Sequence, residues 1–433
     1  MLFSLDVMRA RKGDCLMLHF GKPNDPGLGI IDGGPRKVYA PHLKPRIEQV
    51  RKARHLTGQK PLLVDFLMVS HVDDDHIQGI LDLTKELITS EDAHKPQLVQ
   101  VLSFWHNSFE NIIGSTPDEL TAKFKSQFGP ASTAGDPPSD LTIDAETASD
   151  EETTVSTLKV LASIEQGARL RSDANRLKWP LNPEFDGRLI MARKKGETVE
   201  ISHDLGFTVV GPMLPDLRML HSKHQAWLKE LEKKGVSPEE ALAAYVDRSV
   251  PNLSSIVVLA EANDKRMLLT GDARGDKILQ GLELVGVLPK GRTMEVDVLK
   301  VPHHGSSNNL DDDFFQRIIA DQYVFSGNGE HGNPERESMQ MLLDARGDEH
   351  YTVHLTYPIE EIDVARKSDW EKEKANEKKR KQNNPDKEVR PDWSPKEHSL
   401  AALLEANKSF AKKVKIVEER KPHVIDLLDP VPF

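Results

Sequence analysis

Two histidines and three aspartates lie within six consecutive positions, His71-Val72-Asp73-Asp74-Asp75-His76. They directly follow the apolar run PLLVDFLMVS, whose length and composition predict a buried strand. Neighbouring carboxylates repel one another, and their burial is unfavourable unless a cation compensates. The pattern therefore predicts a metal site rather than a solvated acidic loop. Carboxylates combined with imidazoles favour Mn²⁺, Fe²⁺ or Zn²⁺ over Ca²⁺.

Polar residues also end two apolar runs far downstream. KRMLLTGDA reaches Asp272, and VDVLKVP leads into His303-His304-Gly305-Ser306. Strand ends that converge on one edge of a sheet are where α/β proteins build their sites, so we expect these residues to join the His71 cluster. His106, in FWHNSF at the end of another apolar run, is an alternative metal ligand.

The composition excludes several other classes of protein. The single cysteine, Cys15, rules out an intramolecular disulfide framework and a cysteine-based metal site. No run approaches the roughly 18 apolar residues of a membrane span, and Met1 leads into LFSLDV without the pattern of a signal peptide. We therefore expect a cytoplasmic protein without a membrane partner. The net charge of −11 argues against a surface that is basic everywhere.

Short apolar and alternating segments, separated by turn residues and helical stretches, predict an α/β protein. SSIVVLAE and KRMLLTGD are expected to form a hairpin around Ala262–Asp264, and the tail VKIVEERKPHVIDLL a final strand pair. Changes of pattern mark insertions at about 116–188 and 216–247, with helical spacing in part of each. The charged stretch from Glu360 to His398 is expected to be a solvated helix or linker.

The motifs, in their order along the chain, resemble the metallo-β-lactamase fold hydrolases and, within them, the soluble hydrolase domain of the ComEC competence family. The resemblance rests on LDVMRARKGDCLML, IIDGG, VSHVDDDHIQG, NLSSIVVL, LLTGDA, DVLKVPHHGSSN and SGNGEHGNP. It implies an αββα metallo-β-lactamase-like sandwich with helical insertions. Residues 1–345 would form this hydrolase domain, and residues 346–433 a charged linker and C-terminal extension.

The family signature His-x-His-x-Asp-His implies a set of ligands for two metal ions. His71, Asp73 and Asp272 would hold one ion, while a second would be held by Asp75, His76, Asp272 and His304. Either His303 or His304 matches the last family histidine. A further family histidine falls at or beside Asn252, whose amide oxygen is a weaker ligand.

The resemblance also gives candidates for catalysis and for orienting the imidazoles. The catalytic candidates are Asp75, Lys300 and His303, where Lys300 would help to bind an anionic substrate. Asp32 and Ser70 are candidates to orient the imidazoles. Three carboxylates, two divalent ions and a bridging hydroxide would leave the cluster near neutral, so we expect two ions, Mn²⁺ or Zn²⁺, that activate the hydroxide.

We expect a phosphodiesterase or nuclease, because the aspartate at position 73 suits ions that bind phosphoryl oxygens and because the ComEC-like branch resembles a DNA-degrading domain. The expected partner is nucleic acid or another phosphodiester. A cationic rim would then be needed, for which the candidates are Lys300, Arg274, Arg292 and the run 193–195. The alternatives are a small-molecule esterase or lactonase, and an effector subunit that binds a protein partner through its insertions and acts only in that assembly.

Overall fold

The computed structural model describes residues 1–58, 60–107, 166–196, 198–218, 254–310, 313–383 and 388–432. Almost all of the insertion expected at 216–247 and the first part of that expected at 116–188 lie outside the described residues. The division of the chain into a unit of residues 1–345 and a C-terminal extension stays a prediction.

Six strands form a mixed sheet in the order β16-β1-β2-β3-β5-β7. β1, β2 and β3 are antiparallel neighbours, whereas β5 and β7 extend the sheet in parallel. The strands are β1 (Leu2–Val7), β2 (Leu16–Lys22), β3 (Asp25–Ile31), β5 (Phe66–Val69), β7 (Phe104–His106) and β16 (Val424–Asp426).

Eight strands form a second sheet in the order β15-β14-β13-β12-β11-β10-β9-β8. β8 to β11 are antiparallel, and β11 to β15 are parallel. The hairpin expected around Ala262–Asp264 is confirmed as β10 and β11. The strands are β8 (Thr198–Ser202), β9 (Leu205–Gly211), β10 (Val257–Ala262), β11 (Lys265–Leu269), β12 (Met294–Lys300), β13 (Ile318–Phe325), β14 (Thr352–Leu355) and β15 (Val414–Ile416).

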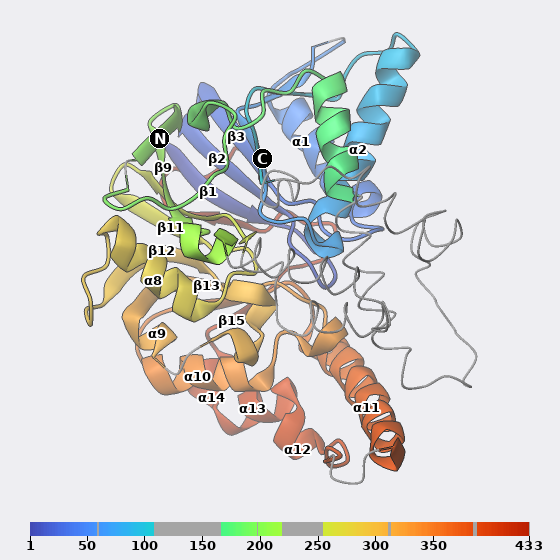
Figure 1. Cartoon of the computed structure of the whole chain (residues 1–433), viewed down its shortest axis with the longest axis vertical. Coiled ribbons are helices and arrows are strands. Elements are labelled where there is room, and N and C mark those ends of the chain that lie inside the picture. The colour runs from blue at the N-terminus through green and yellow to red at the C-terminus, as the bar shows by residue number, and fades with distance from the viewer. Residues whose placement is uncertain are drawn as a thin grey trace, which may run out of the picture.

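The two sheets pack face to face, with helices on their outer faces (Figure 1). Alternation along β2 shows the order, because Leu16 and Leu18 face the second sheet while Met17 faces the helices. α1 (Lys44–Ala53) and α2 (Asp74–Asp92) cover the first sheet. The second sheet is covered by α8 (Gly275–Val285), α9 (Phe314–Arg317), α10 (Arg336–Arg346), α13 (Leu400–Ala406) and α14 (Lys408–Ala411).

The charged stretch after position 359 forms a helix, α11 (Ile359–Asn383), followed by the short α12 (Pro395–His398). Within the described ranges, no helix has the length and apolar character needed to cross a bilayer. The protein is thus a mixed α/β structure with two large sheets and outer helices.

Two expectations about strands were wrong. The run PLLVDFLMVS is divided at Asp65 into β4 (Leu62–Val64), which pairs with β6 (Val99–Val101), and β5. The Asp65 carboxylate accepts hydrogen bonds from Leu28 N at 2.9 Å and from Ser202 Oγ at 2.8 Å, which secures this change of partner. The tail does not form a strand pair, because β15 joins the second sheet and β16 the first.

Candidate metal centre

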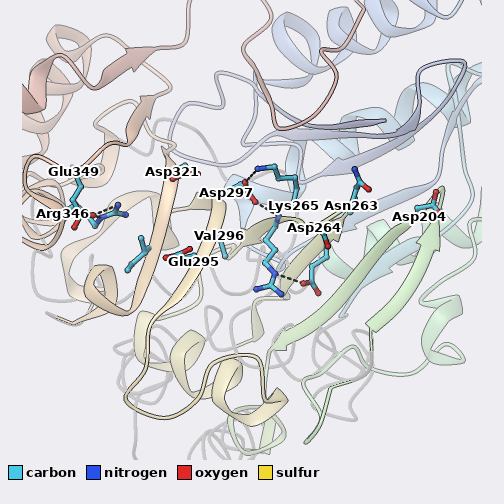
Figure 2. Close-up of a pocket in the computed structure, with 14 residues that line it drawn as sticks. Asp204, Asn263, Asp264, Lys265, Glu295, Val296, Asp297, Asp321, Arg346 and Glu349 are labelled. Atoms are coloured by element: carbon cyan, nitrogen blue, oxygen red, sulfur yellow. Dashed lines mark hydrogen bonds and ion pairs between the residues drawn. The ribbon is translucent and has the colours of Figure 1, made fainter.

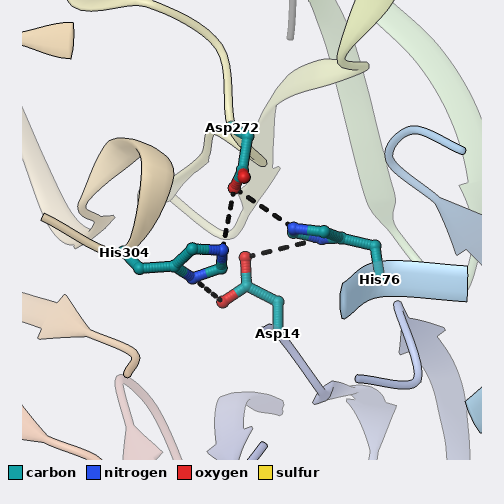
Figure 3. Close-up of side chains that lie close together, drawn as sticks. All are labelled: Asp14, His76, Asp272 and His304. Atoms are coloured by element: carbon teal, nitrogen blue, oxygen red, sulfur yellow. Dashed lines mark ion pairs between the residues drawn. The ribbon is translucent and has the colours of Figure 1, made fainter. Parts of the chain in front are cut away.

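Four buried side chains from distant parts of the chain meet at one edge of the sandwich: Asp14, His76, Asp272 and His304 (Figure 3). Each of them offers a ligand atom within 4.8 Å of those of the others. His71, Asp75 and His76 form a second group by the same distance. We call these six residues the metal cluster. The strand ends therefore converge as the sequence predicts.

The local chain geometry explains why the aspartates and histidines gather here. β5 ends at Val69, and α2 begins at Asp74, so residues 71–76 lie at a strand end and a helix start. The positive end of the helix dipole favours Asp74 and Asp75 in its first turn. α2 lies close to the chain that follows β3, and this approach requires glycine at position 79. A Cβ there would lie 1.9 Å from the carbonyl oxygen of Gly33.

Asp272, which follows β11, presents its two oxygens to different imidazoles. Oδ1 lies 3.2 Å from His76 Nε2 and 3.3 Å from His304 Nε2. Oδ2 lies 3.8 Å from His71 Nε2 and 3.6 Å from His303 Nε2. Asp73 Oδ2 lies 3.6 Å from His71 Nε2. The two oxygens of Asp272 thus face different imidazoles, with the shorter distances on the side of His76 and His304.

Hydrogen-bond partners on the outer side orient three imidazoles. His71 Nδ1 lies 3.1 Å from Ser70 Oγ, and His76 Nδ1 lies 2.8 Å from Asp32 Oδ2. Ser70 Oγ also donates to Asp32 at 2.7 Å. Asp32 and Ser70 thus lie where the sequence places them. His304 Nδ1 lies 3.1 Å from Ser326 Oγ, which in turn donates to Asp14.

The inward atoms provide the test of whether a cation fits. Among the described residues, the Nε2 atoms of His71, His76 and His304 and the Oδ1 atom of Asp272 are buried without a hydrogen-bond partner. Buried polar atoms are normally paired, and orphaned ones call for an explanation such as an ion. Because all four belong to one cluster, its donor set fits a divalent cation that accepts nitrogen and oxygen ligands.

Burial is the largest influence on the ionisable groups of the cluster. It lowers the pKa of His71 to about 3, so that this imidazole is neutral. Burial also lowers the pKa of His304, but the carboxylates of Asp272 and Asp14 outweigh it and raise this pKa to about 9. Asp272 and Asp32 likewise outweigh burial and raise the pKa of His76. When no cation is bound, the protonated His76 and His304 rings thus compensate the negative charge of the carboxylates.

These pKa directions predict how metal binding responds to pH. A cation must displace the protons of His76 and His304, whereas His71, with a pKa of about 3, has none to lose at neutral pH. Below about pH 9, the pKa of His304, the apparent metal affinity should therefore rise with pH by about tenfold per pH unit for each displaced proton. Calorimetric titrations of Zn²⁺ between pH 6 and 9 measure it, and an affinity independent of pH would contradict this protonation state.

Asp32 offers a test of the orienting contacts. Asp32→Asn removes the carboxylate that holds His76 Nδ1, while the amide keeps the volume of the side chain. Such changes beyond the ligands themselves lower metal affinity by about 10–100-fold. Asp82→Asn, a half-buried carboxylate on the same helix α2 as His76, serves as the control and should leave the affinity unchanged. Equal affinities in the two variants would show that Asp32 does not orient the imidazole.

The other residues that the sequence predicts for the site do not belong to the metal cluster. Asn252 lies outside the described residues. His303 borders the cluster and is 28% exposed. Lys300 is 1% exposed, and its ammonium group contacts Asp14 and lies 3.9 Å from Asp272 Oδ1, so it reaches the cluster from behind rather than from solvent. His106 is fully buried at the end of β7, next to β5, but does not belong to either ligand group.

Asp14 is the cluster residue that the sequence reasoning missed. It lies in the loop between β1 and β2, and its backbone N–H donates to the Asp75 carbonyl oxygen at 3.3 Å. The pKa of Asp14 is held well below its usual range, because Lys300 and His304 together outweigh the effect of burial. The available signal was its place beside a glycine in RKGDCLML, one of the motifs that carry the family resemblance.

A separate hollow of about 850 Å³ lies at the N-terminal ends of β11, β12 and β13, which are the strand ends away from the metal cluster (Figure 2). Carboxylates dominate its lining, and its basic residues Lys265, Arg266 and Arg346 are paired with Asp297, Glu261 and Glu349, respectively. No residue of the metal cluster lines it. This hollow is therefore distinct from the metal cluster.

The comparison with known proteins supports the family resemblance. The ComE operon protein 3 of Bacillus subtilis is 28% identical to this chain over 139 residues, which are 30% of the chain and 16% of that protein. The chain is thus similar to a ComEC protein, as the motifs predict, but spans a small part of its length. No protein-family model matches the chain.

Two other similarities are more limited. Microtubule-associated protein 1A of Rattus norvegicus and of Mus musculus is 33% identical over 78 residues, or 18% of this chain and 3% of those proteins. A crystal structure of a protein from Parabacteroides distasonis, described as a metal-dependent hydrolase, aligns with 82% of this chain and 98% of its own at 9% identity. Its TM-score of 0.28 is too low to establish a common fold.

Proposed function

We propose that the protein is a metal-dependent hydrolase of the αββα metallo-β-lactamase type that acts on phosphodiesters. The observation that carries this proposal is the position of Asp272 between the buried His71 ring on one side and the buried His76 and His304 rings on the other. The order of the layers and the similarity to a ComEC protein support it. Phosphodiester specificity rests on the ligand types and on the charge of the cluster.

Two divalent ions match the charge of the cluster. The cluster and its neighbours contain five carboxylates and one buried ammonium group, which leave four negative charges when the imidazoles are neutral. Two divalent cations neutralise these charges, whereas one would leave two negative charges beside an anionic substrate. The five carboxylates are those of Asp14, Asp32, Asp73, Asp75 and Asp272, and the ammonium group is that of Lys300.

The residues of the site differ in whether they would hold an ion and in how far they are exposed to solvent. His71, Asp73 and Asp272 would hold one ion, and Asp75, His76, His304 and Asp272 would hold the other. Such ions lower the pKa of a water molecule from about 15.7 towards about 7 and stabilise negative charge on phosphoryl oxygens. Asp73, Asp75 and His303 are 27%, 20% and 28% exposed, whereas His71, His76, Asp272 and His304 are at most 3% exposed. These three partly exposed side chains therefore mark the mouth of the site.

His303 is placed to move a proton. Its Nε2 lies 3.6 Å from Asp272 Oδ2 at the mouth, and burial lowers its pKa below the usual value, so the ring is neutral at physiological pH. A neutral imidazole there can accept a proton at Nε2 from the attacking water and return it to the oxygen that leaves the substrate. Lys300, buried behind Asp14, has a structural role in this proposal.

The substrate is tested with a panel. Protein loaded with Mn²⁺ or Zn²⁺ is incubated with single- and double-stranded DNA, RNA, cyclic dinucleotides and a set of lactones. We expect cleavage of at least one phosphodiester and none of the lactones. Hydrolysis of lactones but of no phosphodiester would contradict the proposal and would favour a small-molecule esterase or lactonase. Activity that appears only after addition of a binding protein would favour an effector subunit.

A further inference from the structure

The mouth of the metal cluster is bordered by the loop that carries Asp14. A Cβ at Gly13 would lie 1.8 Å from the Asp75 carbonyl oxygen, so only glycine allows this loop to pack against the start of α2. The loop turns Asp14 into the cluster, where it is 2% exposed. Lys12, two residues earlier, is half-buried on the solvent side of the same loop.

A second basic residue meets Lys12 from the other half of the chain. His331 lies in the short helix η7 (Glu330–Gly332), and its Nε2 is 3.4 Å from Lys12 Nζ. The backbone N–H of His331 donates to Asp369 on α11, which fixes this helix in place. Residues separated by 319 positions in the sequence therefore present two nitrogen atoms side by side.

The neighbouring cations are already neutralised by carboxylates. Arg11 forms an ion pair with Glu330 at 2.7 Å, and Lys300 contacts Asp14 inside the protein. Among the described residues, no carboxylate lies within ion-pair distance of Lys12, whose ammonium group contacts the His331 ring. Lys12 also adds to the forces that lower the pKa of Asp75, which agrees with its position beside the mouth.

The cations expected to form a rim lie elsewhere or are engaged. Arg292 precedes β12, at the opposite end of the strand from Lys300, and Lys195 N donates to Leu284 O near the end of α8. Arg274 pairs with Asp276 at 2.9 Å. Lys12 is thus better placed than any of these to meet an anion that approaches the cluster.

We propose that Lys12 and His331 form an anion-binding pair at the mouth of the metal cluster that contacts a phosphate group of the substrate. This inference rests on the proposed phosphodiesterase function. The Lys12 ammonium group would bind phosphate oxygens, and the His331 ring, which accepts a hydrogen bond from this group at Nε2, would orient it. The pair would therefore favour phosphodiesters over neutral esters.

Inorganic phosphate is the probe for this pair. Calorimetry with metal-loaded protein gives its dissociation constant for the wild type, Lys12→Met, Lys12→Arg and His331→Asn. Asparagine is chosen because His331 has a positive φ of 58°, which asparagine tolerates. Loss of one charged contact at a half-exposed site should weaken phosphate binding by about tenfold in Lys12→Met, whereas Lys12→Arg should stay within about threefold.

Metal content and a control lysine separate the possible failures. Lys290→Met removes an exposed lysine beyond α8 and should leave phosphate binding unchanged. All variants should bind metal as the wild type does. Absence of metal from the wild type would refute the proposed function itself. Equal phosphate binding by metal-loaded wild type and Lys12→Met, or no phosphate binding by either, would overturn this inference and leave the hydrolase proposal standing.

The same variants give a kinetic readout with a phosphodiester that the wild type cleaves. Lys12→Met should raise KM by about tenfold with a smaller change in kcat, because the contact is made to bound substrate as well as to the transition state. Hydrolysis of a neutral ester, if the wild type shows any, should be unaffected. An unchanged KM for the phosphodiester would contradict the contact.

Discussion

Asp272→Ala should abolish metal-dependent hydrolysis and leave the chain folded. Its two oxygens serve both imidazole groups, so the variant loses a ligand of each proposed ion at once. Since changes beyond the ligands already cost about 10–100-fold in metal affinity, loss of this shared ligand should cost more than about 100-fold. The wild type should gain about 2.7 kcal/mol of stability at a metal concentration 100 times the dissociation constant. Thermal unfolding with and without metal measures this gain, which should vanish in the variant.

Asp276→Ala is the matched control. Asp276 lies four residues further on, in the first turn of α8, and pairs with Arg274 at the surface. This variant should retain the metal-dependent stabilisation and the activity. If Asp272→Ala still gained stability from metal as the wild type does, Asp272 would not be a ligand.

The second large effect concerns the buried pair of Asp14 and Lys300, which are 2% and 1% exposed. Asp14→Asn leaves the Lys300 ammonium group buried without its closest carboxylate. Breaking such a pair typically costs about 3–5 kcal/mol, because the remaining charge loses its compensation. We expect a loss of this size in the free energy of unfolding of the metal-free protein, measured with urea.

The double variant Asp14→Asn/Lys300→Met provides the internal check. Removal of both charges should recover part of the loss, so the double variant should be more stable than the sum of the single effects predicts. The pair of Lys265 and Asp297, whose side chains are 38% and 16% exposed, is the less buried control, and Lys265→Met should cost at most about 1 kcal/mol. A loss below about 1 kcal/mol in Asp14→Asn would show that the pair does not stabilise the fold.

Local patterns predicted much of the candidate site. The ligand-rich segment after an apolar run and the polar ends of two further runs carried their own signal, because strand ends share a sheet edge. Asp14 does not follow an apolar run and therefore had no signal of this kind. It is a single carboxylate in a β-turn region, and its role arises only when the loop packs against Asp75 and meets Lys300, 286 positions away by sequence number. Lys300 illustrates the same limit, because its burial depends on these long-range contacts.

The fold shows where sequence periodicity is sufficient and where it is not. The β10–β11 hairpin is local and was predicted correctly. The tail strands show the expected alternation of apolar and polar residues, yet they do not pair with each other. β15 pairs with β14, whereas β16 pairs with β1, which lies more than 400 residues away in the sequence. Periodicity identifies a strand but not its partner, since pairing depends on which sheet edge remains open. Similarly, the break at Asp65 follows from contacts with Leu28 and Ser202 in other strands.

The most direct test of the account is the metal content of the purified wild-type protein. The protein is stripped with a chelator, reconstituted with excess Mn²⁺ or Zn²⁺ at pH 8, freed of unbound ions and analysed by elemental mass spectrometry. The position of Asp272 between His71 on one side and His76 and His304 on the other predicts about two ions per chain for the wild type, and far fewer for Asp272→Ala. A wild-type protein that retains no metal under these conditions would contradict the central claim.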